Sequence, residues 1–358
     1  MKTALVYDRI NKWGGAERVL LTLHELFPDA PLFTTVYDKE HAKWASVFDV
    51  KTSFLQQVPL AKSNHEFFPW VATIAFEQFT FDEFDLVISV TSAEAKGIIT
   101  KPGTTHICYC LTPTRYLWSH YDEYFKSSPF RVLTKPVVSH LKKWDKVASS
   151  RPDHYIAIST AVQERIQKYY ARDAHIIFPP VEIKKPKADC ALPIKDYFLI
   201  VSRLVPYKKI DLAIDVFNKS GYPLVIVGQG RDEERLKNMA AKNIFFVKDL
   251  TDEMLSCYYK NSLGFLMLQE EDFGLSAVEA QLHGVPVIAY KKGGAIDSIV
   301  DGKTGILFNN QTTESVKNAI IEFGRKKFKK EDIIKNAERF NKQRFKKELL
   351  SFITKTTR

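Results

Sequence analysis

The stretch EDFGLSAVEAQLHGVPVIA, which runs from Glu271 to Ala289, decides the fold of this chain. An apolar run of strand length, Gly264–Leu268, comes just before it. Leu275–His283 has the apolar spacing of a helix, and a second apolar run, Val285–Ala289, follows at once. Two buried strands joined by one helix form the repeating unit of a parallel sheet. The segment therefore predicts an α/β fold.

Polar groups concentrate at the start of the predicted helix. Glu271 is expected in the loop at the carboxyl end of the strand, and Glu279 two turns into the helix. The backbone amides of Phe273, Gly274 and Leu275 would form the helix N-terminus, where unpaired N–H donors suit phosphate or sugar oxygens. Glycine at position 274 lets a ligand approach the backbone closely. Two glutamates alone would indicate a surface pair around an ordinary helix start, but the whole string favours a binding site.

A second charged segment, SRLVPYKKIDLAIDVF (Ser202–Phe217), has the same placement. Arg203 leaves the end of a predicted strand, Phe198–Ser202, and Lys208 follows five residues later, before a helix. Each cation would contribute about 4 kcal/mol against a charge about 4 Å away at an effective dielectric of about 20. The two cations are therefore suited to hold a diphosphate; a solvated basic turn is the alternative.

Apolar runs and helical patterns alternate along the chain and break once, around 178–187, where prolines and lysines interrupt the periodicity. Strands that alternate with helices predict parallel sheets. We therefore expect two doubly wound, Rossmann-like α/β domains, 1–185 and 186–335, that face each other across a cleft, and a final helix, 336–358, that crosses back to the first domain. Ligands of such sheets bind at the carboxyl ends of the strands. Further strands are expected at Thr3–Tyr7, Leu86–Val90, Ile107–Cys110, His154–Ser159, Leu224–Gly228 and Ile244–Val247, and a long helix at Phe130–Val147.

Glycine clusters follow several of the predicted strands. Gly14-Gly15 opens the first helix and could present backbone amides to a diphosphate, although a plain turn fits this spacing equally well. Gly228 and Gly230 lack the third glycine of a dinucleotide fingerprint, because Glu233 stands in its place. This cluster indicates a tight turn between a strand and a helix rather than an NAD site.

Taken together, these stretches resemble glycosyltransferase family 4 almost from end to end. The resemblance is carried by GGAERVL (Gly14–Leu20), CLTPTRYLW (Cys110–Trp118), SRLVPYKKIDLAI (Ser202–Ile214), VGQG (Val227–Gly230), EDFGLSAVEA (Glu271–Ala280) and GGAIDSIVDGKTGILF (Gly293–Phe308). Two glutamates separated by seven residues, with an upstream Arg and Lys, are specific in combination. The resemblance implies a GT-B fold, a sugar nucleotide bound mainly by the second domain, and transfer with retention of anomeric configuration.

The resemblance also implies roles for residues around the donor. Arg203 and Lys208 would hold the donor diphosphate. Glu271 would contact the transferred sugar, and Glu279 would contact the ribose hydroxyls. Gly15 would offer its amide to the diphosphate from the first domain. The nearest relatives of this type act in O-antigen and capsule assembly, often with GDP-mannose.

One position departs from the family pattern. Relatives commonly read CHTP where this chain has Leu111 after Cys110, and the histidine there usually touches the donor sugar or supports the reacting centre. Leu111 can neither donate a hydrogen bond nor take a proton. In the same stretch, Arg115 and Tyr116 are expected to contact the acceptor.

The expected function is transfer of a hexose, best assigned as mannose from GDP-mannose, to a glycan or polyprenyl-linked acceptor in cell-surface polysaccharide synthesis. No cofactor or metal is expected, because no Asp-x-Asp motif lies at a predicted strand end. Arg203, Lys208 and the amides near Gly274 would neutralise the leaving group instead. Because of Leu111, a catalytically weak subunit that binds sugar nucleotides is an alternative. An α-glucan phosphorylase would need a lysine-bound pyridoxal phosphate, for which the sequence shows no familiar site.

The net charge is +10, and residues 324–358 alone hold 13 Lys and Arg against 4 Asp and Glu. A nucleic-acid binder more often spreads basic groups over a folded face, so no nucleic acid is expected. The basic tail suits a solvated helix face or an anionic membrane surface. It also carries an apolar stripe that must pack on something, and a second candidate membrane contact lies in the first domain. The stripe is Phe345, Leu349, Phe352 and Ile353, and the second contact is Phe67, Phe68, Trp70 and Phe76.

The cysteines and the N-terminus bear on the compartment. No cysteine pair has zinc-ribbon or CxxC spacing, and Cys108 and Cys110 are expected to face a core. Four cysteines in a long chain fit a reducing compartment. The N-terminus resembles a first strand rather than a signal peptide, and the longest apolar stretch is shorter than the roughly 20 residues that span a bilayer. We therefore expect a cytoplasmic protein, peripherally bound at most to the inner face of the membrane.

Overall fold

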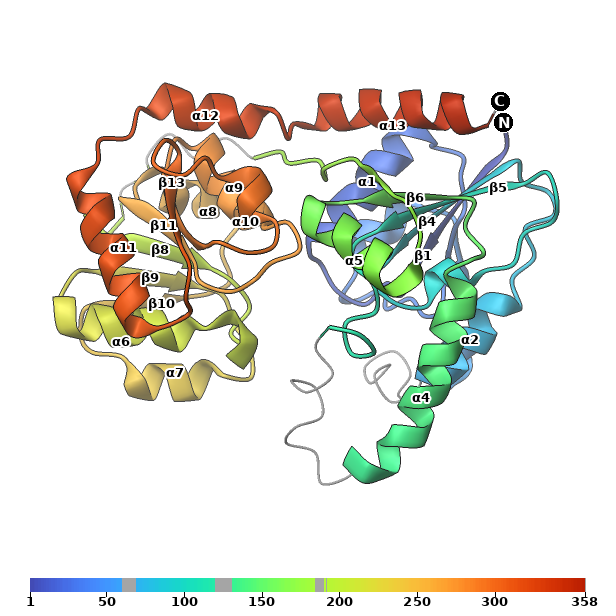
Figure 1. Cartoon of the computed structure of the whole chain (residues 1–358), viewed down its shortest axis with the longest axis horizontal. Helices are drawn as coiled ribbons and strands as arrows, with labels where there is room; N and C mark the ends of the chain where they lie inside the picture. Colours follow the sequence, from blue (N-terminus) through green and yellow to red (C-terminus); the bar gives the residue numbers. More distant parts are fainter. Residues whose placement is uncertain (60–68, 120–130, 184–189, 191, 358) are drawn as a thin grey trace. The chain divides into compact units, whose positions relative to one another are not determined.

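The computed structural model describes residues 1–59, 69–119, 131–183, 190 and 192–357. They form two compact units (Figure 1). The first consists of Met1–Pro180 together with Phe345–Arg358, and the second of Val181–Arg344. Each unit is built on one sheet of parallel strands that alternate with helices along the chain. The predicted pair of doubly wound α/β sheets is confirmed.

The first sheet has seven strands in the order β3-β2-β1-β4-β5-β6-β7. All five residues of β1 are buried apolar or threonine side chains, as expected for a parallel strand that is covered on both faces. The strands are β1 (Thr3–Tyr7), β2 (Leu32–Thr34), β3 (Val50–Thr52), β4 (Leu86–Thr91), β5 (Thr105–Cys110), β6 (His154–Ala157) and β7 (His175–Ile176). The helices between them are α1 (Gly15–Leu26), α2 (Pro69–Glu77), α4 (Arg131–Ala148) and α5 (Thr160–Tyr170).

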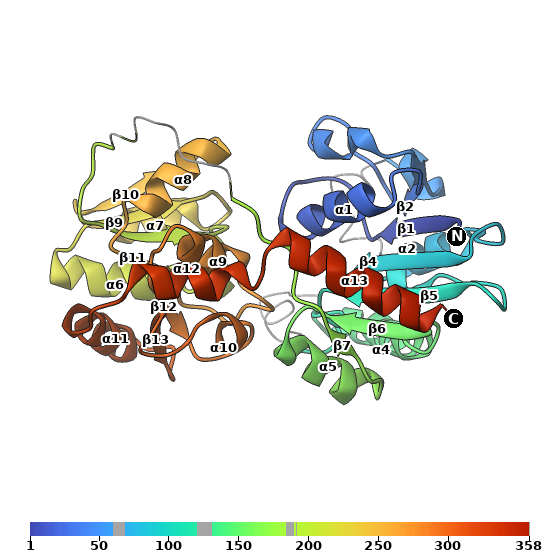
Figure 2. The ribbon, with the colours of Figure 1, turned by 90° about the horizontal axis from the view of Figure 1, so that it is seen from above.

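The final helix, α13 (Lys342–Thr356), packs on the first sheet although it comes last in the chain (Figure 2). Phe345 lies edge-on to Tyr109 of β5, with ring centroids 5.8 Å apart. Phe352 stacks on His175 of β7 at 5.4 Å. The other stripe residues, Leu349 and Ile353, are buried as well. The apolar stripe of the tail therefore faces protein.

The second sheet has six strands in the order β10-β9-β8-β11-β12-β13. Its two faces carry separate apolar cores, one under α6, α7 and α11 and the other under α8, α9 and α10. The strands are β8 (Phe198–Val201), β9 (Leu224–Val227), β10 (Ile244–Val247), β11 (Gly264–Met267), β12 (Val287–Tyr290) and β13 (Gly305–Phe308). The helices are η5 (Pro206–Lys208), α6 (Ile210–Ser220), α7 (Glu233–Met239), α8 (Asp252–Lys260), α9 (Leu275–Leu282), α10 (Ala295–Ser298), α11 (Thr313–Arg325) and α12 (Lys330–Glu338).

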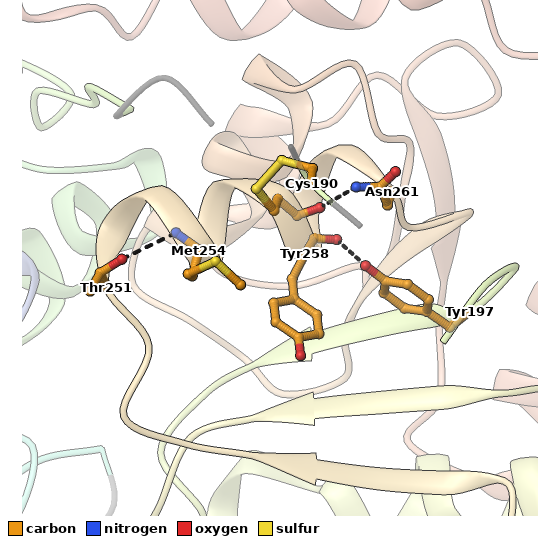
Figure 3. The surroundings of a disulfide bond; sticks show 7 residues. Cys190, Tyr197, Thr251, Met254, Tyr258 and Asn261 are labelled. Carbon is orange, nitrogen blue, oxygen red and sulfur yellow. Dashed lines mark hydrogen bonds between the residues drawn. A yellow bond between two sulfur atoms is a disulfide. The ribbon is translucent and has the colours of Figure 1, made fainter. Parts of the chain in front are cut away.

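Two of the four cysteines form a disulfide. Cys190, in the segment before β8, bonds to Cys257 of α8, 67 residues further along the chain (Figure 3). A disulfide is not what a reducing compartment favours, so the interpretation of the cysteines as reduced is wrong for this pair. The expected burial of Cys108 and Cys110 is confirmed: both lie as free thiols in the core around β5.

The candidate membrane contacts of the first domain separate into three groups. Phe67 and Phe68 lie outside the described residues. Trp70 is 54% exposed, as a surface contact requires. Phe76 is fully buried against Phe79 in an apolar core, so its assignment to a membrane contact is wrong. In the described part of the chain, no helix combines the length and the apolar character that crossing a bilayer would take.

Candidate functional site

The carboxyl ends of β8 and β11 form the topological switch point of the second sheet. From β8 the chain continues to β9 and β10 on one side, and from β11 to β12 and β13 on the other. Open α/β sheets bind ligands at such a point. Arg203 and Lys208 follow β8, and Glu271 follows β11. The three predicted donor residues therefore emerge from the two strands that flank the switch point.

Lys208 and Glu271 are in direct contact. The Lys208 ammonium forms an ion pair with Oε1 of Glu271, and the two side chains are 10% and 21% exposed. The side-chain amide of Gln269 donates to the same oxygen at 2.7 Å. Sequence reasoning missed Gln269, although its position two residues before Glu271 in an extended segment would put both side chains on one side. The carboxylate of Glu271 is thus held by one cation and one amide.

Arg203 has a different environment from Lys208. Its guanidinium is exposed and donates to the hydroxyl of Tyr207 at 2.7 Å. The hydrogen bond fixes the side chain against the turn that precedes Lys208. The two predicted diphosphate cations are therefore distinct: one is buried against a carboxylate, and the other lies at the surface.

Backbone geometry opens the start of α9. Gly274 is the N-cap residue with φ +86°, and no side chain caps the helix, so the first amides of α9 are not covered by a cap. Gly293 has φ +64°, and a Cβ there would lie 2.0 Å from the carbonyl oxygen of Glu271. That close approach allows the amide of Gly294 to donate to the same carbonyl at 2.8 Å. Gly293 and Gly294 thus fix the loop that carries Glu271. Phe273, by contrast, is buried against Phe340.

Glu279 lies deeper than the other acidic residue of the motif. Glu279 is only 6% exposed, and the Tyr259 hydroxyl donates a hydrogen bond to its Oε2 at 2.9 Å. The helix begins at Leu275, so Glu279 lies just past its first turn. The prediction of two turns was wrong: the predicted helix also began at Leu275, and the four residues that take the chain from Leu275 on to Glu279 make little more than one turn.

In the first unit, the predicted glycines begin α1. Gly14 is the N-cap residue of that helix and Gly15 its first residue. A Cβ on Gly14 would lie 3.1 Å from Oε2 of Glu17. Burial raises the pKa of Glu17, which accepts a hydrogen bond from the Tyr7 hydroxyl at 2.7 Å. Sequence reasoning missed this buried carboxylate, for which a helix-start pattern gives no signal.

The switch point of the first sheet lies between β1 and β4. Asp8, just after β1, is 4% exposed. Its carboxylate accepts from the Thr91 hydroxyl at 2.7 Å and from the amides of Ser92 and Ala95 at 2.8 and 2.9 Å. Asp8 therefore ties the ends of β1 and β4 together, a role that the sequence did not predict.

The predicted acceptor residues lie in the loop after β5. The Tyr116 hydroxyl donates at 2.8 Å to Glu94, a residue after β4 that is almost fully buried. Burial raises the pKa of the Glu94 carboxyl. Arg115 is half-buried in the same loop. Leu111, where relatives commonly have histidine, directly follows β5, and its amide donates to the Thr91 carbonyl at 2.8 Å.

A buried ion pair supports this loop from beneath. Lys96 and Asp145 are 2% and 1% exposed and lie 2.5 Å apart. Asp145 also accepts from the Thr114 hydroxyl at 2.8 Å and from the Trp118 indole at 2.7 Å. Because Thr114 and Trp118 flank Arg115 and Tyr116, the ion pair fixes both ends of the predicted acceptor segment.

The second unit offers a consistent set of chemical groups. A cation and uncapped amides suit phosphate oxygens, and a carboxylate suits sugar hydroxyls or a developing positive charge. Among the residues that the structure describes, no three His, Cys, Asp or Glu side chains gather as metal ligands would.

Comparisons with known sequences agree with this placement. Residues 189–340 match the family described as glycosyl transferases group 1. An uncharacterized glycosyltransferase of Methanocaldococcus jannaschii is 25% identical over 205 residues, which make up 55% of this chain and 57% of that protein. A GDP-mannose-dependent alpha-(1-6)-phosphatidylinositol monomannoside mannosyltransferase of Mycolicibacterium smegmatis is 30% identical over 138 residues, 34% of this chain and 36% of that protein. The chain thus spans little more than half the length of the first relative and about a third of the second.

A solved structure extends the similarity to the whole chain. HepE of Anabaena, in complex with UDP and glucose, superposes with a TM-score of 0.72 and 17% identity over 99% of this chain and 100% of that one. At this identity the likeness concerns the fold. Residues 189–340 thus match the glycosyl transferases group 1 family, and the chain as a whole has the GT-B fold.

Proposed function

We propose that this chain is a retaining glycosyltransferase that moves a hexose from a nucleoside diphosphate sugar to a glycan or lipid-linked acceptor. The observation that carries the proposal is the contact between Lys208 and Glu271 at the switch point of the second sheet. It joins a cation suited to a phosphate with a carboxylate suited to a sugar, from two different strands. The match of residues 189–340 to a glycosyltransferase family supports the same function.

In the proposed reaction, the bond between the anomeric carbon and the diphosphate oxygen breaks. An acceptor hydroxyl oxygen bonds to that carbon from the same face, and its proton passes to the leaving phosphate oxygen. Arg203, Lys208 and the first amides of α9 stabilise the negative charge of the departing nucleoside diphosphate. Glu271 orients the sugar and stabilises positive character at the anomeric carbon, without bonding to it covalently.

We assign the donor to the second unit and the acceptor to the first. The family match supports the donor assignment, because the matched residues, 189–340, all lie in the second unit. Phe273, Gly274 and Leu275 would contribute their amides, and Glu279 would bind ribose. Arg115 and Tyr116 would contact the acceptor, and Gly14 and Gly15 would approach the donor diphosphate from the first unit.

GDP-mannose is the proposed donor, and a cell-surface polysaccharide the proposed product. The mycobacterial relative, which is named as GDP-mannose-dependent, supports mannose. The solved relative holds UDP and glucose, so uridine donors are the direct competitors. Nucleoside diphosphate release from GDP-mannose, UDP-glucose and ADP-glucose would separate them. We expect GDP release to be at least about tenfold faster, a difference of about 1.4 kcal/mol in barrier. Faster UDP or ADP release would overturn the mannose assignment, but the proposal that the chain is a glycosyltransferase would stand.

Leu111 favours one other function, a subunit that binds the sugar nucleotide but turns it over weakly. Such a protein would bind the nucleotide but release nucleoside diphosphate only slowly from every donor. In that case Leu111→His should raise the release rate, because histidine restores a hydrogen-bonding group beside the reacting centre. An unchanged rate would show that position 111 does not limit turnover.

We also propose peripheral contact with an anionic membrane through a basic segment of the second unit. Arg325, Lys326, Lys327, Lys329 and Lys330 are all exposed around the end of α11 and the start of α12. Each would add about 1 kcal/mol near an anionic surface. The protein should bind anionic vesicles and not neutral ones. Its binding to anionic vesicles should weaken when salt is added, and also in the double variant Lys327→Gln, Lys329→Gln. Equal binding to both vesicle types, or to neither, would reject this docking.

A further inference from the structure

Glu279 is held by a residue from outside the helix that carries it. The Tyr259 hydroxyl, near the end of α8, donates to Oε2 of Glu279 at 2.9 Å in a buried environment. The Tyr259 ring stacks on His283, with ring centroids 5.3 Å apart and 18° between the planes. Tyr259 therefore contacts both the side chain of Glu279 and the end of the same helix.

His283 closes this set of contacts. Its Nδ1 lies 2.8 Å from the carbonyl oxygen of Glu279. Burial lowers the pKa of His283, so the ring is neutral, and Nδ1 carries the proton because a carbonyl oxygen only accepts. The stacked ring is thus fixed to the backbone of α9, and Tyr259 rests on a rigid surface.

The helix that carries Tyr259, α8, is itself held by a disulfide and by hydrogen bonds (Figure 3). Cys257, two residues before Tyr259, bonds to Cys190 in the segment that leads into β8. The Tyr197 hydroxyl, at the start of β8, donates to the Tyr258 carbonyl at 2.7 Å. At the helix start, Thr251 caps α8 through the amide of Met254. The disulfide therefore ties α8 to the segment before β8, and the Tyr197 hydrogen bond ties α8 to the residue that precedes β8, the strand from which Lys208 follows.

We propose that Tyr259 is a positioning residue for donor binding, holding the Glu279 carboxylate toward the ribose hydroxyls of the nucleoside diphosphate sugar, and that the Cys190–Cys257 disulfide keeps α8 where this hydrogen bond forms. This inference rests on the proposed function, which assigns the ribose to Glu279. A carboxylate with one oxygen held by a tyrosine has one preferred rotamer. Without that hydroxyl, the side chain gains alternatives that do not present it to ribose.

Tyr259→Phe tests the inference, because it removes one oxygen atom and keeps the stacking on His283. The probes are GDP and UDP with their 2′-deoxy and 3′-deoxy forms, measured by isothermal titration calorimetry. We expect the wild-type protein to prefer the ribose forms by about tenfold, the size of one hydrogen bond to a charged group. Tyr259→Phe should lose most of this preference, with weaker binding of the ribose forms and similar binding of the deoxy forms. A residue with only a structural role would weaken all forms equally, and that result would overturn the proposal.

Tyr258→Phe is the matched control. It removes one hydroxyl from the neighbouring position of α8, and the Tyr258 ring still packs against Tyr197. The ribose preference of this variant should equal that of the wild type. A wild-type protein that binds none of the nucleotides would overturn the proposed function and this inference with it. Normal wild-type binding with an unchanged preference in Tyr259→Phe would overturn this inference alone.

Dithiothreitol tests the role of the disulfide. It supplies two electrons and two protons, which leave thiols at Cys190 and Cys257, and it closes into its own cyclic disulfide. The ribose preference of the reduced protein should fall about threefold, and Cys190→Ala, at a half-buried position, should give the same fall without reductant. If both change the melting temperature and leave the preference intact, the disulfide stabilises the unit but does not position Glu279.

Discussion

The two sheets end differently at their switch points. In the second unit, Lys208 and Glu271 bring opposite charges together from the ends of β8 and β11, and both stay partly accessible. In the first unit, the ends of β1 and β4 are joined by Asp8, whose carboxylate accepts from two hydroxyls and two amides and is almost fully buried. The same topology thus carries a candidate binding site in one unit and a structural contact in the other. A switch point alone does not show where a ligand binds; the burial and the partners of its carboxylate distinguish the two cases.

The largest expected effect is on Lys208. Lys208→Ala should lower kcat/KM by about a hundredfold or more, about 2.7 kcal/mol, because it removes the diphosphate cation and leaves the Glu271 carboxylate without its ion pair. The measurement is nucleoside diphosphate release under steady-state conditions. Lys209→Ala, at the exposed neighbouring position, is the control and should stay near wild type. Equal losses in both variants would mean that charge in the loop, rather than this contact, matters.

Asp8→Asn should act on stability instead. The side-chain amide of asparagine has N–H groups where the carboxylate has an acceptor oxygen, so at least one donor around position 8 would face another donor. We expect this loss of a hydrogen bond to lower the free energy of unfolding by about 2 kcal/mol. Urea unfolding measures the loss, with the exposed Asp82→Asn as control. The folded variant should keep its kcat. A large fall in kcat with unchanged stability would give the first switch point a chemical role and remove the contrast between the units.

Arg203→Ala is expected to fall between Lys208→Ala and the controls. The guanidinium is exposed and bonded to Tyr207, so its loss should lower kcat/KM by about tenfold, or about 1.4 kcal/mol. The same release assay applies, at low and high salt, because an exposed cation is screened more than a buried one. A loss as large as that of Lys208→Ala would show that burial does not rank the two cations.

The smallest effect concerns Glu94 in the first unit, and it depends on pH. Burial raises its pKa above the ordinary 4.5, so the folded state binds the proton more tightly than the unfolded state does. The stability that this proton confers is present below the unfolded pKa and is lost as pH rises through the folded pKa. Glutamine has no proton to lose in this range, so Glu94→Gln should not be destabilised as pH rises. The difference in unfolding free energy, variant minus wild type, should therefore increase between pH 4 and pH 7.5. The exposed Glu40→Gln should show no such trend.

Much of the fold could be predicted because the central strands are continuous apolar runs. β1 and β10 match their predicted bounds, and most others differ by one to three residues. β2, β3, β7 and β13 were not predicted as strands, because runs of two to four residues show little of a period. β12 begins at Val287 rather than Val285, since Pro286 has no N–H to give to the ladder.

The sequence named most of the candidate site residues but not the contacts between them. Motifs and the family resemblance named Arg203, Lys208, Glu271 and Glu279. Nothing in the sequence indicated that Lys208 would pair with a residue 63 positions away. The same holds for Tyr259 and Glu279 and for the Cys190–Cys257 bond. Such partners are chosen by packing of elements that are distant in sequence, and local patterns carry no record of that packing.

The last helix sets an order of events during synthesis. Phe345, Leu349 and Ile353 cover part of the first sheet, yet they leave the ribosome only after all of the second unit, residues 181–344. At about 5–20 residues per second, translation of that insert takes roughly 10 to 30 s. During this time the second unit has its whole sequence and can fold, while an apolar strip of the first sheet beside Tyr109 stays open to solvent. The first unit is therefore the part of the nascent chain most prone to aggregation, and it remains so until the last helix has been synthesised.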